Sequence, residues 1–244
     1  MKKLMIIAFA VLLIQAAKAQ SNTTSYSDKS GFRIQGGVGI STLYFKKDDA
    51  NYQNLKSKIK VGGFAGIGYE KRFGKVFALQ PELNYANKGA KRSYFIPTTN
   101  ETAKVKMNMH TLELPVLFKF YLGDNFNIYL GPYASFLLAA SSKSKFYNPS
   151  DAMTGEDKSV NIMKDHYKDA DGNSYFNRFD VGLNAGLEFV TNKGFFIGAR
   201  INQGFLDLTN DNYKGYVGSD AVILSGDNRW VGNTGVQAMA GFRF

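Results

Sequence analysis

The chain has 244 residues, a formal net charge of +10 and no cysteine. Its length fits one domain, and the lack of cysteine excludes disulfides, thiol catalysis and thiolate metal sites. The lysines are scattered through polar segments without the interleaved aromatic residues of a nucleic-acid surface, so we expect no nucleic-acid partner.

The N-terminus has the three parts of a secretory signal peptide. Lys2 and Lys3 precede an apolar run over residues 4–14, which is too short for a membrane-spanning helix. The small-x-small sequence Ala17-Lys18-Ala19 then forms a cleavage site. We therefore expect a cleaved signal peptide over residues 1–19. Because this leader carries three lysines and no acid, the exported chain keeps a charge of +7.

Eight later segments alternate apolar and polar residues with the period of two that is typical of β-strands. In the fourth of them, Leu112, Leu114 and Val116 alternate with Thr111 and Glu113. A helix would show a period of 3.6, which these segments lack. The expected strands cover about residues 32–42, 59–70, 75–87, 109–122, 126–139, 178–190, 195–207 and 234–244.

The connections between these segments alternate in length. Those at 72–75, 123–125 and 191–194 are short, whereas those at about 43–58, 88–108, 140–177 and 208–233 are long and polar. Short periplasmic turns and long extracellular loops are the pattern of bacterial transmembrane barrels. We therefore expect an all-β fold, an eight-stranded antiparallel transmembrane up-and-down β-barrel over residues 32–244 in the cell outer membrane. Residues 20–31 would form an N-terminal periplasmic segment.

Aromatic residues gather near the short turns and predict a girdle at the membrane interface. They are Tyr69, Phe73, Phe77, Tyr121, Phe126, Phe189, Phe195 and Phe244. The alternative is a soluble barrel, which would turn its apolar face inward and leave the charges without a place. Three prolines, Pro81, Pro115 and Pro132, fall inside expected strands, and their missing N–H predicts a bulge or a break in the pairing.

Charges of both signs fall on the face that the alternation turns inward. They are Arg33, Lys60, Glu70, Glu82, Glu113, Lys119, Arg178, Asp180, Glu188, Arg200 and Arg243. An eight-stranded barrel has room only for side chains inside, and unpaired buried charges are costly. We therefore expect a lumen filled by a carboxylate–guanidinium network; the rival is a narrow path for ions. Glu82 and Glu113 would be neutralised by Lys119 and Arg200 rather than serve as an acid–base pair.

Other candidate chemistry is sparse. His110 and His166 are isolated in the sequence, so we expect no metal centre and no catalytic role for them. Residues 169–180 carry acids and amides at several positions of a calcium loop, but Ser174 stands where that loop requires glycine. We interpret this segment as a polar turn and expect no cofactor.

Several segments resemble the PorT-like outer membrane protein beta-barrel domain family of Gram-negative bacteria. They are Pro81-Glu82-Leu83-Asn84-Tyr85-Ala86-Asn87-Lys88-Gly89, Leu112-Glu113-Leu114-Pro115-Val116-Leu117-Phe118-Lys119-Phe120-Tyr121, Gly131-Pro132-Tyr133 and Gly198-Ala199-Arg200-Ile201-Asn202-Gln203-Gly204-Phe205. The resemblance covers nearly all of the chain from Gly31 to Phe244. It implies an eight-stranded outer-membrane barrel without catalytic residues and, through PorT, a link to a protein secretion system.

The last strand ends in Ala238, Ala240, Phe242 and Phe244 at alternate positions. This ending is similar to the C-terminal signal that the barrel assembly machinery reads. The same pattern is also that of a last strand facing outer-membrane lipid.

Taken together, the sequence favours a non-enzymatic barrel whose exposed loops, above all 140–177, contact a partner. That partner would be another envelope or secretion-system protein, or an external polymer. A narrow pore for small solutes or ions is the alternative. A membrane-embedded hydrolase or acyltransferase is disfavoured, because the isolated histidines and scattered serines form no catalytic set.

Overall fold

The computed structural model describes residues 30–45, 56–96, 101–147, 158–161, 176–208, 210 and 231–244. Its strands are β1 (Gly31–Phe45), β2 (Lys56–Lys58), β3 (Lys60–Phe73), β4 (Phe77–Ile96), β5 (Glu101–Tyr121), β6 (Phe126–Tyr147), β7 (Lys158–Asn161), β8 (Phe179–Val190), β9 (Phe195–Gly204) and β10 (Val231–Arg243). No helix in the described ranges is long and apolar enough to span a membrane. The expected signal peptide lies outside the described residues.

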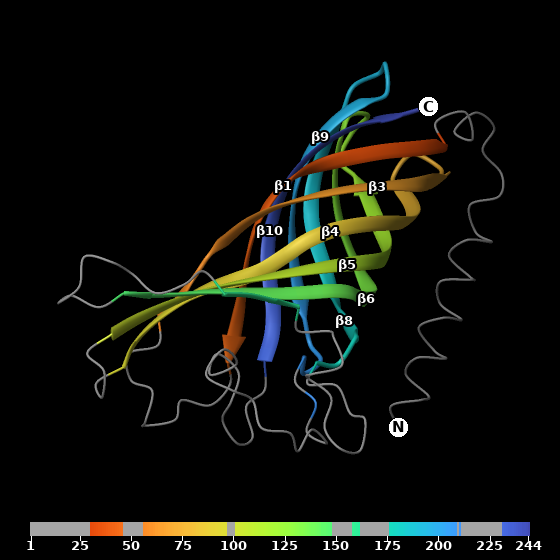
Figure 1. The fold of residues 1–244 in the computed structure, drawn as a ribbon. Coiled ribbons are helices and arrows are strands. Elements are labelled where there is room, and N and C mark those ends of the chain that lie inside the picture. Colours follow the sequence, from red (N-terminus) through yellow and green to blue (C-terminus); the bar gives the residue numbers. More distant parts are fainter. Residues whose placement is uncertain are drawn as a thin grey trace.

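Eight of the strands close into a ring (Figure 1). The antiparallel order is β1–β3–β4–β5–β6–β8–β9–β10, and β10 returns to pair with β1. Val38 of β1 lies opposite both Ala238 of β10 and Gly63 of β3, which shows that the first and last strands complete the barrel. The expected eight-stranded barrel is therefore confirmed. The short strands β2 and β7 are not part of this ring. Strand β2 pairs with β4 and β7 pairs with β6.

The three short turns join β3 to β4, β5 to β6, and β8 to β9. Each contains one glycine with a positive φ: Gly74 at 93°, Gly123 at 88° and Gly194 at 90°. L residues with side chains rarely adopt this region, whereas glycine does so without strain. The tight hairpins that the sequence predicts at these positions thus form as expected.

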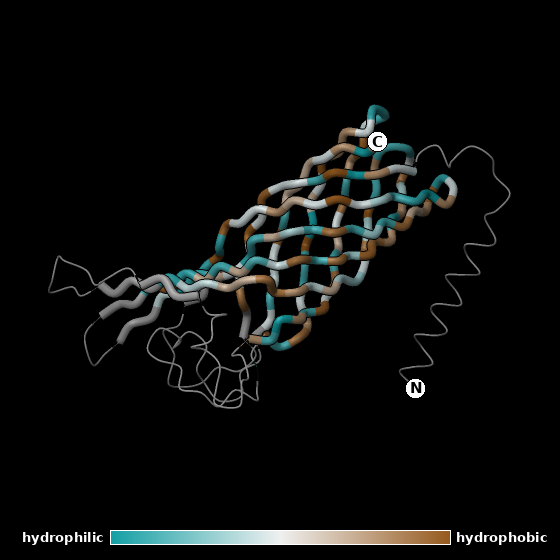
Figure 2. Tube along the Cα trace, turned by 45° about the vertical axis from the view of Figure 1, so that its right-hand side comes forward, coloured by the Kyte–Doolittle hydropathy of each residue, from teal (hydrophilic) through white to brown (hydrophobic). Residues whose placement is uncertain are grey.

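The two faces of the wall have opposite polarity. Large apolar side chains such as Ile34, Leu114 and Ile201 point outward and are 54%, 55% and 56% exposed. The inward positions carry most of the buried polar and charged side chains, and Figure 2 shows the resulting alternation along each strand. A water-soluble protein buries its apolar side chains, so this inversion indicates that hydrocarbon surrounds the barrel.

Strands β4, β5 and β6 are longer than the alternation predicted. Strand β4 reaches Ile96, β5 begins at Glu101 and β6 reaches Tyr147. Most of the expected loop 88–108, and residues 140–147 of the expected loop 140–177, are therefore strand. In Figure 1 the three strands run on together to the left of the barrel. The sequence underestimated them because their outward residues change from apolar to polar, which hides the membrane pattern.

The prolines break the pairing as expected. Bridges are missing between β5 and β6 at 116–117, beside Pro115 and opposite Pro132. They are also missing between β3 and β4 at 69–70, opposite Pro81. The register is the same on both sides of each break. One shift of register is found elsewhere between β5 and β6, at His110 and Thr111.

Most of the predicted girdle lies at the short-turn end on the outer face. Tyr69, Phe189, Phe195 and Phe244 are 36% to 68% exposed there. Tyr121 is an exception and corrects the prediction. It is buried inside the barrel, because it occupies an inward position of β5 and its hydroxyl binds a carboxylate.

Candidate functional site in the barrel lumen

The inward positions of seven strands place most of the sequence-predicted charges in the lumen. Arg33, Lys60, Glu70, Glu82, Glu113, Lys119, Asp180, Glu188 and Arg200 are buried, and Arg243 is half-buried. Arg178 does not join them. It is exposed at a bend before β8, which starts only at Phe179, so its predicted place in the lumen is wrong.

Two carboxylates, Glu70 and Glu188, organise the end of the lumen near the short turns. Arg33 joins them, with Nη1 2.7 Å from Glu70 Oε2 and Nη2 2.5 Å from Glu188 Oε2. Lys119 Nζ lies 3.1 Å from Glu70 Oε2 and 2.8 Å from Glu188 Oε1. All four side chains are almost completely buried. This arrangement compensates charges whose isolated burial would be prohibitive.

Glu70 has further partners. Its Oε1 accepts hydrogen bonds from the Tyr121 hydroxyl at 2.6 Å and from Arg243 Nη1 at 2.9 Å, and Arg72 Nε lies 3.3 Å away. Five side chains from four strands therefore converge on one carboxylate. Arg33 also stacks on Phe196, with Cζ 3.7 Å from the ring centroid. The cluster thus joins strands from both ends of the sequence.

A second layer centres on Glu82. Arg200 Nη2 lies 2.8 Å from Glu82 Oε1, and the amides of Gln80 and Asn84 donate to the same carboxylate at 2.5 and 2.7 Å. Gln35 in turn donates to Asn84 Oδ1 at 2.9 Å. One charged donor and two amide donors therefore hold this carboxylate, and hydrogen bonds to an ionised acceptor of this kind are strong.

The third layer corrects a predicted pairing. Glu113 pairs with Lys88, whose Nζ lies 2.5 Å from Oε1, and not with Lys119. Thr111 donates to the same carboxylate at 3.2 Å. The Tyr133 hydroxyl donates to Asp180 Oδ2 at 3.2 Å. Lys119 is too far down β5 for Glu113 and serves Glu70 and Glu188 instead.

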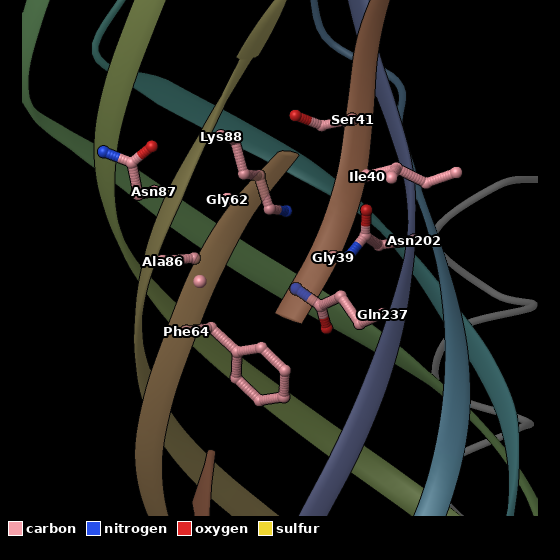
Figure 3. Close-up of a pocket in the computed structure, with 11 residues that line it drawn as sticks. Gly39, Ile40, Ser41, Gly62, Phe64, Ala86, Asn87, Lys88, Asn202 and Gln237 are labelled. Atoms are coloured by element: carbon pink, nitrogen blue, oxygen red, sulfur yellow. The ribbon is translucent and has the colours of Figure 1, made fainter. Parts of the chain in front are cut away.

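A small cavity lies among the inward side chains. Its volume is about 10 Å³, and its lining includes Ser41, Phe64, Lys88, Asn202 and Gln237 (Figure 3). This volume is close to the minimum that holds one water molecule. A wider depression of about 440 Å³ opens at the short-turn end. It lies at the mouth, lined in part by Asn192, Arg243 and Phe244, and not along the lumen.

The remaining candidates lie away from this network. His110 faces outward on β5 and pairs with the Tyr85 hydroxyl, 2.6 Å from Nδ1. His166 and most of the calcium-like segment 169–180 lie outside the described residues, and Asp180, at its end, is bound to Tyr133. No group of side chains able to hold a metal ion occurs in the described ranges.

Sequence reasoning missed Arg72 and Lys88. The sequence predicts a turn over residues 72–75, but β3 continues through Phe73 and places Arg72 in the lumen. Lys88 stands one residue past the predicted end of its strand. The sequence did contain a signal for Lys88. At every second position from residue 80 to residue 88 the side chain is polar, except at residue 86.

The last strand, β10, carries the predicted assembly signal on its outer face. Ala238 and Ala240 are exposed and pair with Val38 and Gly36 of β1. Phe242 and Phe244 are 41% and 68% exposed, with ring centroids 5.1 Å apart. The residues are thus placed where lipid would contact them.

An antiparallel ring with apolar side chains outside and paired charges inside defines an integral outer-membrane barrel. The chain belongs to the outer membrane protein beta-barrel domain family, whose model matches residues 18–210. The protein is accordingly located in the outer membrane. No curated protein matches the sequence significantly.

Among solved structures, the chain is similar to three bacterial proteins. Ail, the attachment invasion locus protein of Yersinia pestis, is 14% identical, with a TM-score of 0.41 over 88% of this chain and 99% of that one. Neisserial surface protein A is 10% identical, with a TM-score of 0.43 over 88% and 99%. OprG from Pseudomonas aeruginosa is 14% identical, with a TM-score of 0.37 over 88% and 96%.

Proposed function

We propose that this protein is a non-enzymatic, PorT-like barrel with a filled lumen that contacts a partner through its extracellular side. The observation that carries the proposal is the ionic network itself. Arg33, Lys119, Glu70 and Glu188 meet across the lumen as buried ion pairs. A barrel closed in this way offers its outer end, rather than an internal path, for function.

The carboxylates of the network support the non-enzymatic part of the proposal. Glu82 and Glu113, the strongest candidates for acid–base work, are each held by a cation within 2.8 Å. A general acid or base must instead be able to exchange a proton with a substrate within hydrogen-bond reach. Burial in a filled lumen denies these carboxylates such access.

The partner proposed is another envelope protein, and the PorT resemblance favours one of a secretion system. Barrel assembly machinery would act earlier, on the outward-facing Phe242 and Phe244 at the end of β10. In the mature protein the extracellular end remains, where β6 and β7 form a hairpin arm. Ser144 of β6 lies opposite Lys158 of β7, so the two ends of the segment 145–157 are next to each other.

That pairing allows the segment to be removed while the rest of β6 stays paired with β5; only the last three residues of β6, 145–147, are lost from that pairing. Replacing residues 145–157 with Asn-Gly gives a two-residue connection suited to an antiparallel pair. We expect the variant to fold but to lose its partner when outer membranes are crosslinked and the barrel is purified. A control variant with Asn-Gly in place of the short turn 192–193 should retain the partner. Equal recovery of one specific partner with both variants would contradict the proposal.

The same preparations distinguish the proposal from a narrow pore. Reconstituted in planar bilayers, the wild-type barrel should give no regular single-channel steps, because the charged layers exclude a continuous file of water. A 16-stranded porin, which has an aqueous channel, serves as the positive control. Stable steps of uniform size from the purified barrel would favour the pore instead.

A further inference from the structure

Lysines that are scattered in the sequence form one row on the extension of the barrel. Lys58 of β2 lies opposite Lys91 of β4, Lys91 opposite Lys106 of β5, and Lys106 opposite Lys143 of β6. All four side chains are exposed. Directly opposite residues share one face of a sheet and lie about 4.5–5.5 Å apart at Cβ. The row therefore concentrates positive charge along a line across four strands. Lys104, next but one to Lys106, adds to the same face.

This face is the continuation of the surface that meets lipid. Along β5 the outward residues from the short-turn end are first apolar, as at Val116, Leu114 and Leu112. They are then polar at His110 and Asn108, and cationic at Lys106 and Lys104. Strand β4 shows the same order, from Leu83 through Tyr85 and Asn87 to Lys91, and β6 leads from Leu138 through Ser141 to Lys143.

Between the apolar and the cationic residues, two polar side chains on neighbouring strands contact each other. The Tyr85 hydroxyl lies 2.6 Å from His110 Nδ1, and their rings stack at 5.9 Å between centroids. Amphipathic rings of this kind prefer the level of lipid head groups. The lysine row then lies just above that level, on the extracellular side.

Repulsion between the lysines of the row destabilises the isolated protein. Like charges placed directly opposite each other on a sheet destabilise the pairing. Among the described residues, no carboxylate forms an ion pair with Lys58, Lys91, Lys106 or Lys143. The reverse face of the same strands is buried, through Val105, Met107, Ala140 and Ser142. The lysine face is therefore the one that is presented outward, and an anion from outside the chain would relieve its repulsion.

We propose that this lysine row binds the phosphate groups of an anionic glycolipid in the outer leaflet of the outer membrane. A lipid is favoured over a polymer from the medium because the row continues the lipid-facing surface and directly follows the head-group level. Anionic head groups attract basic clusters placed next to a membrane-spanning segment. The inference rests on the location of the barrel and is independent of the protein partner proposed above.

The test uses the purified full-length barrel in neutral detergent, titrated with diphosphoryl lipid A and followed by native mass spectrometry. The variant K91Q/K106Q/K143Q should bind lipid A roughly a hundredfold more weakly at low salt, since each lysine near an anionic surface contributes about fivefold. The control K71Q/K75Q/K193Q removes the same charge from the short-turn end, where Lys71, Lys75 and Lys193 are exposed. Its affinity should match that of the wild type.

Unchanged lipid A affinity in K91Q/K106Q/K143Q would overturn the proposal. So would tighter binding of soluble dextran sulfate than of lipid A by the wild type, because the row would then serve an external polymer. The triple variant should melt no lower than the wild type, since it loses repulsion. Should it not fold, the single variant K106Q, which has lysines on both sides, must still weaken binding about fivefold.

Discussion

Replacing Glu70 with alanine should destabilise the barrel by about 3–5 kcal/mol, the usual cost of removing one partner from a buried ion pair. Arg33, Arg72, Lys119 and Arg243 would lose their shared carboxylate. Of these four, Arg33 and Lys119 would still pair with Glu188. Burial keeps water from replacing it. The measurement is guanidinium unfolding of the refolded barrel in detergent micelles, followed by far-ultraviolet circular dichroism.

Two comparisons make the Glu70→Ala result specific. Asp124→Asn removes a carboxylate charge from an exposed turn at the same end and should change stability by less than about 0.5 kcal/mol. Adding Arg33→Met to Glu70→Ala should cost less than the sum of the two single changes, because the groups share one network. If the free energy of unfolding of Glu70→Ala lies within about 1 kcal/mol of the wild-type value, the cluster does not hold the barrel together.

The second large effect is expected at Gly186 of β8. Tyr129 of β6 lies directly opposite it, and its ring covers the glycine inside the lumen. A Cβ added to Gly186 would lie 2.5 Å from Tyr129 Cζ and would also meet the backbone oxygen of Ala199. Tyr129 is buried, and its hydroxyl accepts from Arg200 Nε at 3.4 Å. The glycine therefore makes room for a ring that supports the second ionic layer.

Gly186→Val should destabilise the barrel by about 3 kcal/mol or more, at the upper end of the cost of overpacking. Folding yield is measured by the difference in gel migration between heated and unheated samples. The neighbouring Ala185 faces outward and is exposed, so Ala185→Val should behave like the wild type. Normal folding of Gly186→Val would show that the ring and the backbone can move apart easily, contrary to this packing.

The sequence predicted the fold well because a barrel repeats one local rule. The period of two at Leu112, Leu114 and Val116 assigns each residue of β5 to a face without knowledge of its neighbours. The turn glycines Gly74, Gly123 and Gly194 mark the short hairpins in the same local way. Strand number and the alternation of loop lengths then determine a closed antiparallel ring.

The pairing inside the lumen could not be predicted in this way. Alternation places Glu113 and Lys119 on the same face, but the register between strands decides that Lys88 meets Glu113. Lys119, six residues further along β5, meets Glu70 and Glu188 from other strands. Closure of the ring brings residues 155 positions apart, Arg33 and Glu188, into contact. No local pattern contains that information.

Departures from strict alternation explain the other differences. Arg178 has inward parity, yet the chain bends before β8 and turns it to solvent. The lysines of the extension looked like loop residues because each strand contributes only one or two. Register alone gathers Lys58, Lys91, Lys106 and Lys143 into a row.

The central claim is that hydrocarbon contacts one face of each strand and that the other face is enclosed. Because the natural chain has no cysteine, single cysteines along β5 can carry a spin label whose collisions with oxygen and with a nickel chelate are measured in lipid vesicles. Labels at outward Leu114 and Val116 should meet oxygen freely and the chelate hardly at all, whereas labels at inward Thr111 and Leu117 should meet neither. Strong chelate collisions at Leu114 and Val116, or no alternation along the strand, would contradict the account.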